Sequence, residues 1–269
     1  MSPETLAVFG LSSEPFSKEI DDADLWLPPS KQALLDELVD AAEARKSVVL
    51  VGEPGVGKTC VLRALRHALP KERFRLTYCH NVTLGRRDFY RQLCFTLGLP
   101  RGATAGDVFW AISTHVEQLA QDRLMPVLLV DEAHLLHQDT LDHLHILLNY
   151  AWDSRALLSL ILVGLPDLED RLRLRRNRSL YSRLHHRLSI GPLTPEDTAD
   201  YVRMRVLRVG GSKELFSSDS VALIHEAAGG LRDIDRVATL ALRLASRRKR
   251  KVVERDLVAR VLQSEGDRS

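Results

Sequence analysis

The octapeptide "GEPGVGKT", residues 52–59, constrains the fold of this chain more than any other stretch. It fits the pattern GxxxxGK[ST], in which glycines let the backbone wrap so that its N–H groups point inward and form an anion nest. The apolar run "SVVLVG" (47–52) precedes it, and a helical pattern through Leu69 follows it. This context predicts a phosphate-binding loop between a buried strand and a helix whose positive dipole end also attracts anions.

The positions of this loop predict particular contacts with a nucleoside triphosphate. We expect Lys58 to reach the β- and γ-phosphates, and we expect the Thr59 hydroxyl to ligate Mg²⁺. The predicted nucleotide-binding residues are those of the loop and the residue that follows it: Gly52, Glu53, Pro54, Gly55, Val56, Gly57, Lys58, Thr59 and Cys60.

A second apolar run, "PVLLV" (126–130), ends in two acids, Asp131 and Glu132. Ligands of parallel α/β sheets bind beside the carboxyl ends of the strands, so these acids are expected where the metal is needed. We expect Asp131 to hold Mg²⁺ and Glu132 to act as the base toward the attacking water. Such an acid pair behind a complete phosphate loop indicates an ATPase with a catalytic glutamate, so ATP and Mg²⁺ are the predicted ligands.

The letters "DEAH" at 131–134 are also the label of a helicase box. A helicase of that type needs two sheet domains, and further motifs lie on the second one. Residues 135–269 remain after the box, and from 194 onward they show only helical periodicity. The sequence therefore disfavours a helicase.

Apolar runs alternate with helical patterns up to residue 193, which predicts a parallel sheet covered by helices on both faces. The expected strands are 47–52, 73–81, 126–131, 158–164 and 186–193. After them Thr194 is a candidate N-cap, with Pro195 in the first helical turn.

We therefore expect an α/β P-loop core at 30–193 and a small all-helical domain at 194–269 with a basic C-terminal helix. Residues 1–29 form an extension that we expect to pack on or near the nucleotide, with contact to a neighbouring copy as the alternative.

Composition limits the class of protein. Hydrophobic residues make up 45% of the chain and charged residues 28%, as in ordinary soluble proteins. The three widely spaced cysteines favour free thiols in a reducing compartment over a disulfide framework or a zinc site. The N-terminus lacks the pattern of a signal peptide, and no apolar run reaches the about 18 residues of a membrane helix. We therefore expect a cytoplasmic protein that does not contact a membrane.

Positive charge is concentrated, although the net charge is only +2. Segments 171–187 and 243–255 are strongly basic, and Arg86, Arg87 and Arg91 follow the second expected strand. Basic groups of this kind contact the phosphates of duplex DNA, but they also occur on solvated helix faces. The three arginines are therefore candidate DNA contacts, with ordinary surface charge as the alternative.

Several phrases resemble AAA+ ATPases of the ExeA-like type and the related transposition helpers of the TniB and TnsC type. They are "FGLSSEPF" (9–16), "LLVDEAHLL" (128–136), "LILVGLPDLEDRL" (160–172), "SRLHHRLSIGPLTPEDTADYV" (182–202) and "IHEAAGGLRDIDRVATLAL" (224–242). Because the phosphate and acid motifs are generic, the order and spacing of these phrases carry the resemblance, over about residues 9–262. It implies an AAA+ core with a five-stranded parallel sheet and a C-terminal helical lid domain.

The resemblance also implies roles for polar residues outside the two motifs. Asn81 resembles the polar switch that restrains the catalytic glutamate. Arg183 lies where such proteins place the arginine finger that reaches a neighbour's γ-phosphate, and Arg187 is the second candidate. Arg232 resembles the lid arginine called sensor 2, which touches the phosphates of its own subunit. Each would add positive charge where negative charge develops during hydrolysis.

One position departs from the family pattern and bears on activity. The polar sensor 1 residue after the fourth strand is replaced by Leu165, whose side chain cannot hydrogen-bond a phosphate or water. Slow hydrolysis, or a replacement by another group, is therefore expected.

A finger supplied by a neighbour implies self-assembly into a ring or a helix. The resemblance further implies assembly on duplex DNA and recruitment or activation of a transposase. The alternatives are a secretion-associated ATPase, and an assembly switch that binds ATP without hydrolysing it.

Overall fold

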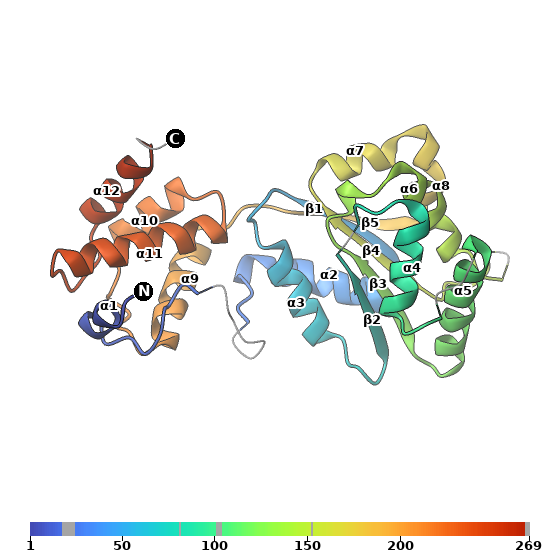
Figure 1. The fold of residues 1–269 in the computed structure, drawn as a ribbon, viewed down its shortest axis with the longest axis horizontal. Helices are drawn as coiled ribbons and strands as arrows, with labels where there is room; N and C mark the ends of the chain where they lie inside the picture. Colours follow the sequence, from blue (N-terminus) through green and yellow to red (C-terminus); the bar gives the residue numbers. More distant parts are fainter. Residues whose placement is uncertain (18–24, 81, 101–103, 152, 267–269) are drawn as a thin grey trace. The chain divides into compact units, whose positions relative to one another are not determined.

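The computed structural model describes residues 1–17, 25–80, 82–100, 104–151 and 153–266, drawn as a ribbon in Figure 1. The chain divides into two compact units. One comprises Ala33–Glu53 and Val61–Ile190, and the other comprises Met1–Gln32, Pro54–Cys60 and Gly191–Ser269. The boundary expected at residue 193 thus lies two residues beyond the start of the second unit's last segment.

A five-stranded parallel sheet forms the centre of the first unit, which confirms the predicted fold class. The strand order is β2-β3-β4-β1-β5. The strands are β1 (Ser47–Gly52), β2 (Phe74–Cys79), β3 (Met125–Val130), β4 (Ser159–Gly164) and β5 (Leu184–Ile190). Every residue of β1 and β4 is buried, as expected for inner strands covered on both faces, whereas the edge strands β2 and β5 mix buried and exposed residues.

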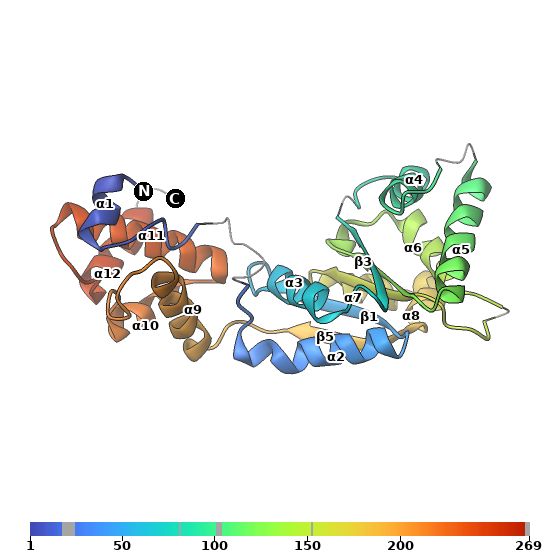
Figure 2. The same cartoon turned by 90° about the horizontal axis from the view of Figure 1, so that it is seen from below.

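Helices cover both sides of this sheet. They are α2 (Gln32–Glu43), α3 (Lys58–Ala68), α4 (Arg86–Thr96), α5 (Ala105–Gln121), α6 (Gln138–Leu144), α7 (Asp167–Arg173) and α8 (Arg178–Tyr181). Figure 2 shows α2 on one side of the sheet and α4 and α5 on the other. Right-handed crossovers predict helices on both sides, because α3 connects β1 to β2 in the direction opposite to the later connections through α4 and α5.

The second unit, called here the helical unit, consists mostly of four helices. They are α9 (Pro195–Arg208), α10 (Ser218–Ala227), α11 (Leu231–Arg247) and α12 (Arg255–Gly266). The predicted N-cap is confirmed, since the Thr194 side chain accepts from the Asp197 amide while the Asp197 carboxylate accepts from the Thr194 amide. Their apolar faces meet in one core, which is separate from the core around the sheet.

The N-terminal segment belongs to this helical core. Helix α1 (Pro3–Val8) is followed by Leu11 and Phe16, both buried among side chains of α9 to α12. The Phe16 ring meets the Phe216 ring edge-on, with 5.8 Å between the centroids. The sequence did not predict this packing, and the expected position of the extension near the nucleotide stays a prediction.

Arg205 of α9 ties the N-terminal segment to the helices. Its side chain is 1% exposed, and its Nε donates to the carbonyl of Pro15 at 2.6 Å. Its Nη1 donates to the Tyr201 hydroxyl at 2.8 Å, and that hydroxyl donates to the Asp235 carboxylate at 2.7 Å. The Nη2 group also donates to the carbonyl of Ser17. A buried guanidinium with this set of partners fixes the chain that precedes the sheet domain.

Among the described residues, no helix combines the length and the apolar character that crossing a membrane requires.

Replacing Arg205 by Leu should destabilise the helical unit by about 3 kcal/mol, because it leaves buried carbonyl and hydroxyl groups without partners. Urea unfolding followed by circular dichroism measures the loss. Arg203→Ala is the matched control: Arg203 is half-exposed on the same helix and pairs with Asp200, so its loss should stay within about 0.5 kcal/mol. An Arg205→Leu protein as stable as the control would contradict the structural role.

Candidate functional site

The phosphate-loop motif lies where the sequence predicts, between the end of β1 and the start of α3. Gly55 and Gly57 have φ angles of 84° and 101°, in the left-handed region that favours glycine. Lys58 and Thr59 follow as the first two residues of α3, and Thr59 is exposed. The loop therefore has the backbone conformation and the helix N-terminus that an anion nest needs.

The first residues of α11 lie against this loop, within the same compact unit. The Leu231 amide donates a hydrogen bond to the Gly55 carbonyl at 3.1 Å. A Cβ atom on Gly230 would stand 2.4 Å from both the carbonyl carbon and the carbonyl oxygen of Gly55, so no side chain fits there. Arg232, the predicted sensor 2 residue, comes directly after this contact. The contact thus positions the start of α11, and Arg232 with it, beside the loop.

Asp131 lies at the carboxyl end of β3, as predicted, and is 7% exposed. The Tyr78 hydroxyl on neighbouring β2 donates to its Oδ2 at 2.8 Å, and the Glu132 amide donates to its Oδ1 at 2.9 Å. Burial raises the pKa of Tyr78, and its hydrogen bond to Asp131 raises that pKa further, so the hydroxyl stays a donor. Both carboxylate oxygens are oriented, and each keeps a lone pair for another partner.

Glu132 departs from ordinary backbone geometry, with a φ of 53°. Its side chain is 49% exposed, and its Oε2 lies 3.5 Å from Nδ1 of His134, a ring that is 10% exposed. The same Nδ1 lies 3.4 Å from the backbone amide of Leu165, which donates to it. The ion pair with Glu132 requires a proton on Nδ1 of His134. The hydrogen bond from the Leu165 amide requires a lone pair on the same nitrogen. His134 therefore makes only one of these two interactions at a time.

The turn that carries His134 is held by Arg171 of α7. Its guanidinium donates to the carbonyl of Leu136 at 2.8 Å and also to the carbonyl of His134. Gly164, the last residue of β4, leaves room for the turn, since a Cβ there would stand 3.1 Å from the His134 amide nitrogen. The sequence patterns described above assign no role to His134 or to Arg171.

Both candidate finger residues have partners within the chain. Nη2 of Arg183 pairs with the Asp153 carboxylate at 2.8 Å, and its Nη1 donates to the Ser179 carbonyl at 3.0 Å. The guanidinium of Arg187 lies over the Tyr181 ring, 4.2 Å from its centroid. Asn81, the predicted polar switch, lies outside the described residues, so its role stays a prediction.

The candidate DNA contacts lie on α4. Arg87 and Arg91 are four residues apart, so they share one helix face, and Nη1 of Arg91 is 3.9 Å from the exposed Asp88 carboxylate. Nη1 of Arg86 lies 2.9 Å from Nε2 of His143.

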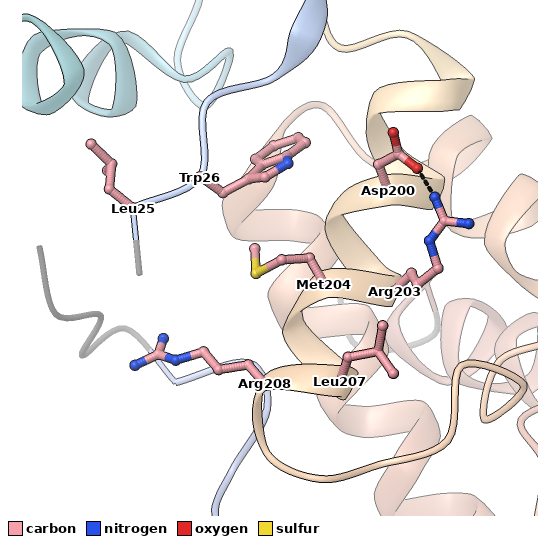
Figure 3. Close-up of a pocket in the computed structure, with 7 residues that line it drawn as sticks. All are labelled: Leu25, Trp26, Asp200, Arg203, Met204, Leu207 and Arg208. Atoms are coloured by element: carbon pink, nitrogen blue, oxygen red, sulfur yellow. Dashed lines mark hydrogen bonds and ion pairs between the residues drawn. The ribbon is translucent and has the colours of Figure 1, made fainter. Parts of the chain in front are cut away.

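A cavity of about 780 Å³ opens beside α9 in the helical unit. Figure 3 shows Met204 of α9 pointing toward Trp26, with Leu207 and Arg208 from the next turn. The Trp26 ring also packs on the Tyr201 ring, 5.1 Å between centroids. These contacts attach residues 25–26 to α9, and none of the predicted site residues lines this cavity.

Residues 39–172 match the model of the AAA domain. These residues form an AAA domain. They contain the phosphate loop, the acid pair and four of the five strands, and an AAA domain implies nucleotide binding.

General secretion pathway protein A from Aeromonas hydrophila is 32% identical to this chain over 254 residues, which are 93% of the chain. The chain spans 46% of that curated relative's length.

Solved structures share the fold at low sequence identity. Cdc6p from Pyrobaculum aerophilum has a TM-score of 0.67 at 20% identity, over 87% of this chain and 68% of that one. Drosophila ORC bound to DNA has a TM-score of 0.70 at 21% identity, over 97% of this chain and 65% of that one. The RuvB Holliday junction branch migration motor of Thermotoga maritima has a TM-score of 0.59 at 16% identity, over 87% of this chain and 69% of that one. The AAA+ P-loop core is therefore the fold of this chain, and the helical unit after it is compatible with a lid domain.

Tyr78→Phe removes the donor to Asp131 of the AAA domain. We expect the magnesium concentration for half-maximal ATP hydrolysis to rise about tenfold or more, because one hydrogen bond to a charged group is worth about 1.5 to 3 kcal/mol. Tyr181→Phe is the control, since that hydroxyl lies 3.4 Å from Arg173 on the surface. Identical magnesium dependence in both variants would show that Tyr78 does not support Asp131.

Gly230→Ala places a methyl group against the Gly55 carbonyl. The loop or α11 must shift, so we expect ATP affinity to fall about tenfold, within the usual penalty for overpacking. Titration with a fluorescent ATP analogue measures this. Gly85→Ala is the control, because a Cβ there meets nothing within 4 Å. Unchanged affinity in Gly230→Ala would mean that the contact does not position the loop.

Proposed function

We propose that this chain binds and hydrolyses ATP with Mg²⁺, in the manner of an AAA+ ATPase. The observation that carries the proposal is the buried Asp131, whose two oxygens are oriented by Tyr78 and by the Glu132 amide at the end of an inner strand. A carboxylate held in this way is suited to a hard cation such as Mg²⁺.

The chemistry of the donor set fits magnesium nucleotide. Among the described residues there is no group of three or more His, Cys, Asp and Glu side chains that could hold a metal ion. Mg²⁺ in phosphate sites usually takes one or two protein ligands together with phosphate oxygens and water. The proposed protein ligands are Asp131 and the Thr59 hydroxyl, while Lys58 binds the phosphates.

Glu132 is the proposed base. Its carboxylate is half-exposed, and among the described residues its contact is Nδ1 of His134 at 3.5 Å, so it is accessible to water. A bound Mg²⁺ would withdraw charge from the γ-phosphate, and Glu132 would accept the proton of the attacking water. His134, whose Nδ1 accepts from the Leu165 amide, is the group proposed to stand in for a sensor 1 side chain.

Arg183 is the proposed finger, supplied to a neighbouring copy, with Arg187 as the alternative. Self-assembly of copies is therefore part of the proposed mechanism, as a ring or a helical filament. Arg232 is proposed to contact the phosphates within its own subunit. Its place directly after the Leu231–Gly55 hydrogen bond supports this role.

Mixing two inactive variants tests the shared site. Glu132→Gln and Arg183→Ala should each lose about 100-fold or more in ATPase rate. Mixed together they should recover part of it, because a subunit with Glu132 then meets a neighbour with Arg183. If this mixture recovers no activity, but a mixture of Glu132→Gln with Arg187→Ala does, then Arg187 is the arginine finger.

Single-turnover rates decide between hydrolysis and a switch. If wild type and Glu132→Gln hydrolyse ATP at equal rates, the chain is an ATP-dependent assembly switch and not an ATPase.

The proposed target of the assembly is duplex DNA, on which the chain would recruit or activate a transposase. Three observations support this: the sequence resemblance to transposition helpers, the exposed or partly exposed arginines of α4, and a fold shared with Drosophila ORC bound to DNA and with a Holliday junction motor. Basic side chains that neutralise phosphates release counterions, which gives the binding a steep dependence on salt.

A salt series tests the DNA proposal. In the presence of ATP, retention of duplex DNA should fall steeply with salt, with a logarithmic slope of about −0.9 for each neutralised phosphate. Replacing Arg86, Arg87 and Arg91 by Ala should make the slope shallower by up to about three. Retention that is absent, or that does not respond to salt, would remove duplex DNA as the target.

Secretion is the second candidate target, favoured by the 32% identity to general secretion pathway protein A of Aeromonas hydrophila. It predicts that the chain fractionates with envelope membranes in an ATP-dependent manner. Fractionation with membranes together with absent DNA retention would favour it over transposition.

A further inference from the structure

A cavity of about 250 Å³ is lined by residues of α4, α5, α6 and the 3₁₀ turn His145–Leu148. Helix α4 packs against both α5 and α6. The residues that determine its chemistry are Arg86, Arg87, Tyr90, Phe109, His143 and Ile146. None of them belongs to the proposed ATP site, and all lie within one compact unit.

The Tyr90 hydroxyl in this wall has no hydrogen-bond partner among the residues that the structure describes. The side chain is 9% exposed, its ring meets the Phe89 ring edge-on, and its hydroxyl makes no hydrogen bond with any described residue. Burial raises the pKa of Tyr90, which keeps the proton on the hydroxyl. Buried hydroxyls in folded proteins are almost always hydrogen-bonded, so this one points to an acceptor that the chain does not supply.

Two guanidinium groups and one imidazole provide the polar rim. Nδ1 of His143 lies 2.8 Å from the Asp139 carbonyl and donates to it, so Nε2 accepts from Nη1 of Arg86 at 2.9 Å. His143 is therefore neutral in this arrangement and leaves the charge of Arg86 unbalanced. Arg87 forms no ion pair with a described residue. The rim is positive, and no carboxylate lines the described walls.

The size and the walls of the cavity select the ligand. Nucleotides and other drug-sized ligands need about 300 to 1,000 Å³, whereas a cavity of about 150 Å³ holds a benzene ring. A volume near 250 Å³ therefore suits one bulky apolar side chain. Phe109 and the partly exposed Ile146 present apolar surface to it. A nucleic-acid backbone could neutralise the arginines but would leave these walls and the Tyr90 hydroxyl unused.

We propose that this cavity docks a peptide segment of a partner protein, which inserts one bulky apolar side chain and pairs an adjacent carboxylate with Arg86 or Arg87. The Tyr90 hydroxyl donates to a carbonyl or carboxylate oxygen of the same segment. The lining residues are not among the proposed ATP-site residues, so the peptide is expected to bind with or without nucleotide.

Fluorescence anisotropy with labelled Gly/Ser peptides tests the proposal on the full chain. One probe carries a central Asp-Phe-Glu, and the others replace the Phe by Ser or both acids by their amides. We expect the first probe to bind at least about tenfold more tightly than either of the others, because each lacks one of the two recognised groups. Equal binding by all three probes, or no binding by the first, overturns the proposal.

Matched variants locate the binding. Tyr90→Phe should weaken the Asp-Phe-Glu probe about fivefold, the effect of one hydrogen bond, and Arg87→Glu should weaken it more. Ile146→Ser should also weaken it, without adding charge. Arg91→Glu is the control on the same helix outside the cavity, and it should leave peptide affinity unchanged. Thermal unfolding of each variant confirms that it folds.

Retention of duplex DNA by the same variants separates the peptide site from the proposed DNA contacts. Ile146→Ser and Tyr90→Phe should leave DNA retention unchanged, because phosphates do not need the apolar wall. If both variants weaken DNA retention as strongly as peptide binding, or if Arg91→Glu abolishes peptide binding, the cavity is not a peptide site.

Discussion

The complete burial of the inner strands β1 and β4 is the constraint on which the arrangement of polar groups depends. Neither strand tolerates a charge along its length, so polar chemistry is confined to the turns that leave the sheet. β1 ends at Gly52, β3 at Val130 and β4 at Gly164, and parallel pairing brings these ends to one edge. The order β3-β4-β1 therefore places the turn with Asp131 and Glu132, the turn after β4 and the start of the phosphate loop side by side.

Much of this follows from the residues. Apolar runs and their flanking patterns predict all five strands, and the loop and acid motifs predict the residues that follow β1 and β3. The start of α9 is readable from the Thr194 capping box. The helix after the acid pair is short: α6 ends at Leu144 and a 3₁₀ turn continues to Leu148. Apolar residues continue past that end, so periodicity alone gives no stop signal.

The supporting residues could not be predicted in the same way. Tyr78 reaches Asp131 because β2 and β3 pair in one particular register, with Tyr78 opposite Leu129. Gly230 meets Gly55 across 175 residues of sequence, and Arg205 binds Pro15 across 190. Each contact depends on long-range packing, and a single sequence offers at most a weak signal for it, such as the paired glycines at 229–230.

The pairing of Arg183 with Asp153 sets the energetics of any assembly that uses this arginine. Arg183 would have to leave the Asp153 carboxylate before it could contact a phosphate of a neighbouring copy. The free energy of association would therefore gain only the difference between these two interactions. A terminal phosphate carries more negative charge than a carboxylate, so it attracts the arginine more strongly. Once hydrolysis removes that phosphate, the stronger attraction is lost. Copies of the chain would then separate after each turnover because the arginine returns to its own acid.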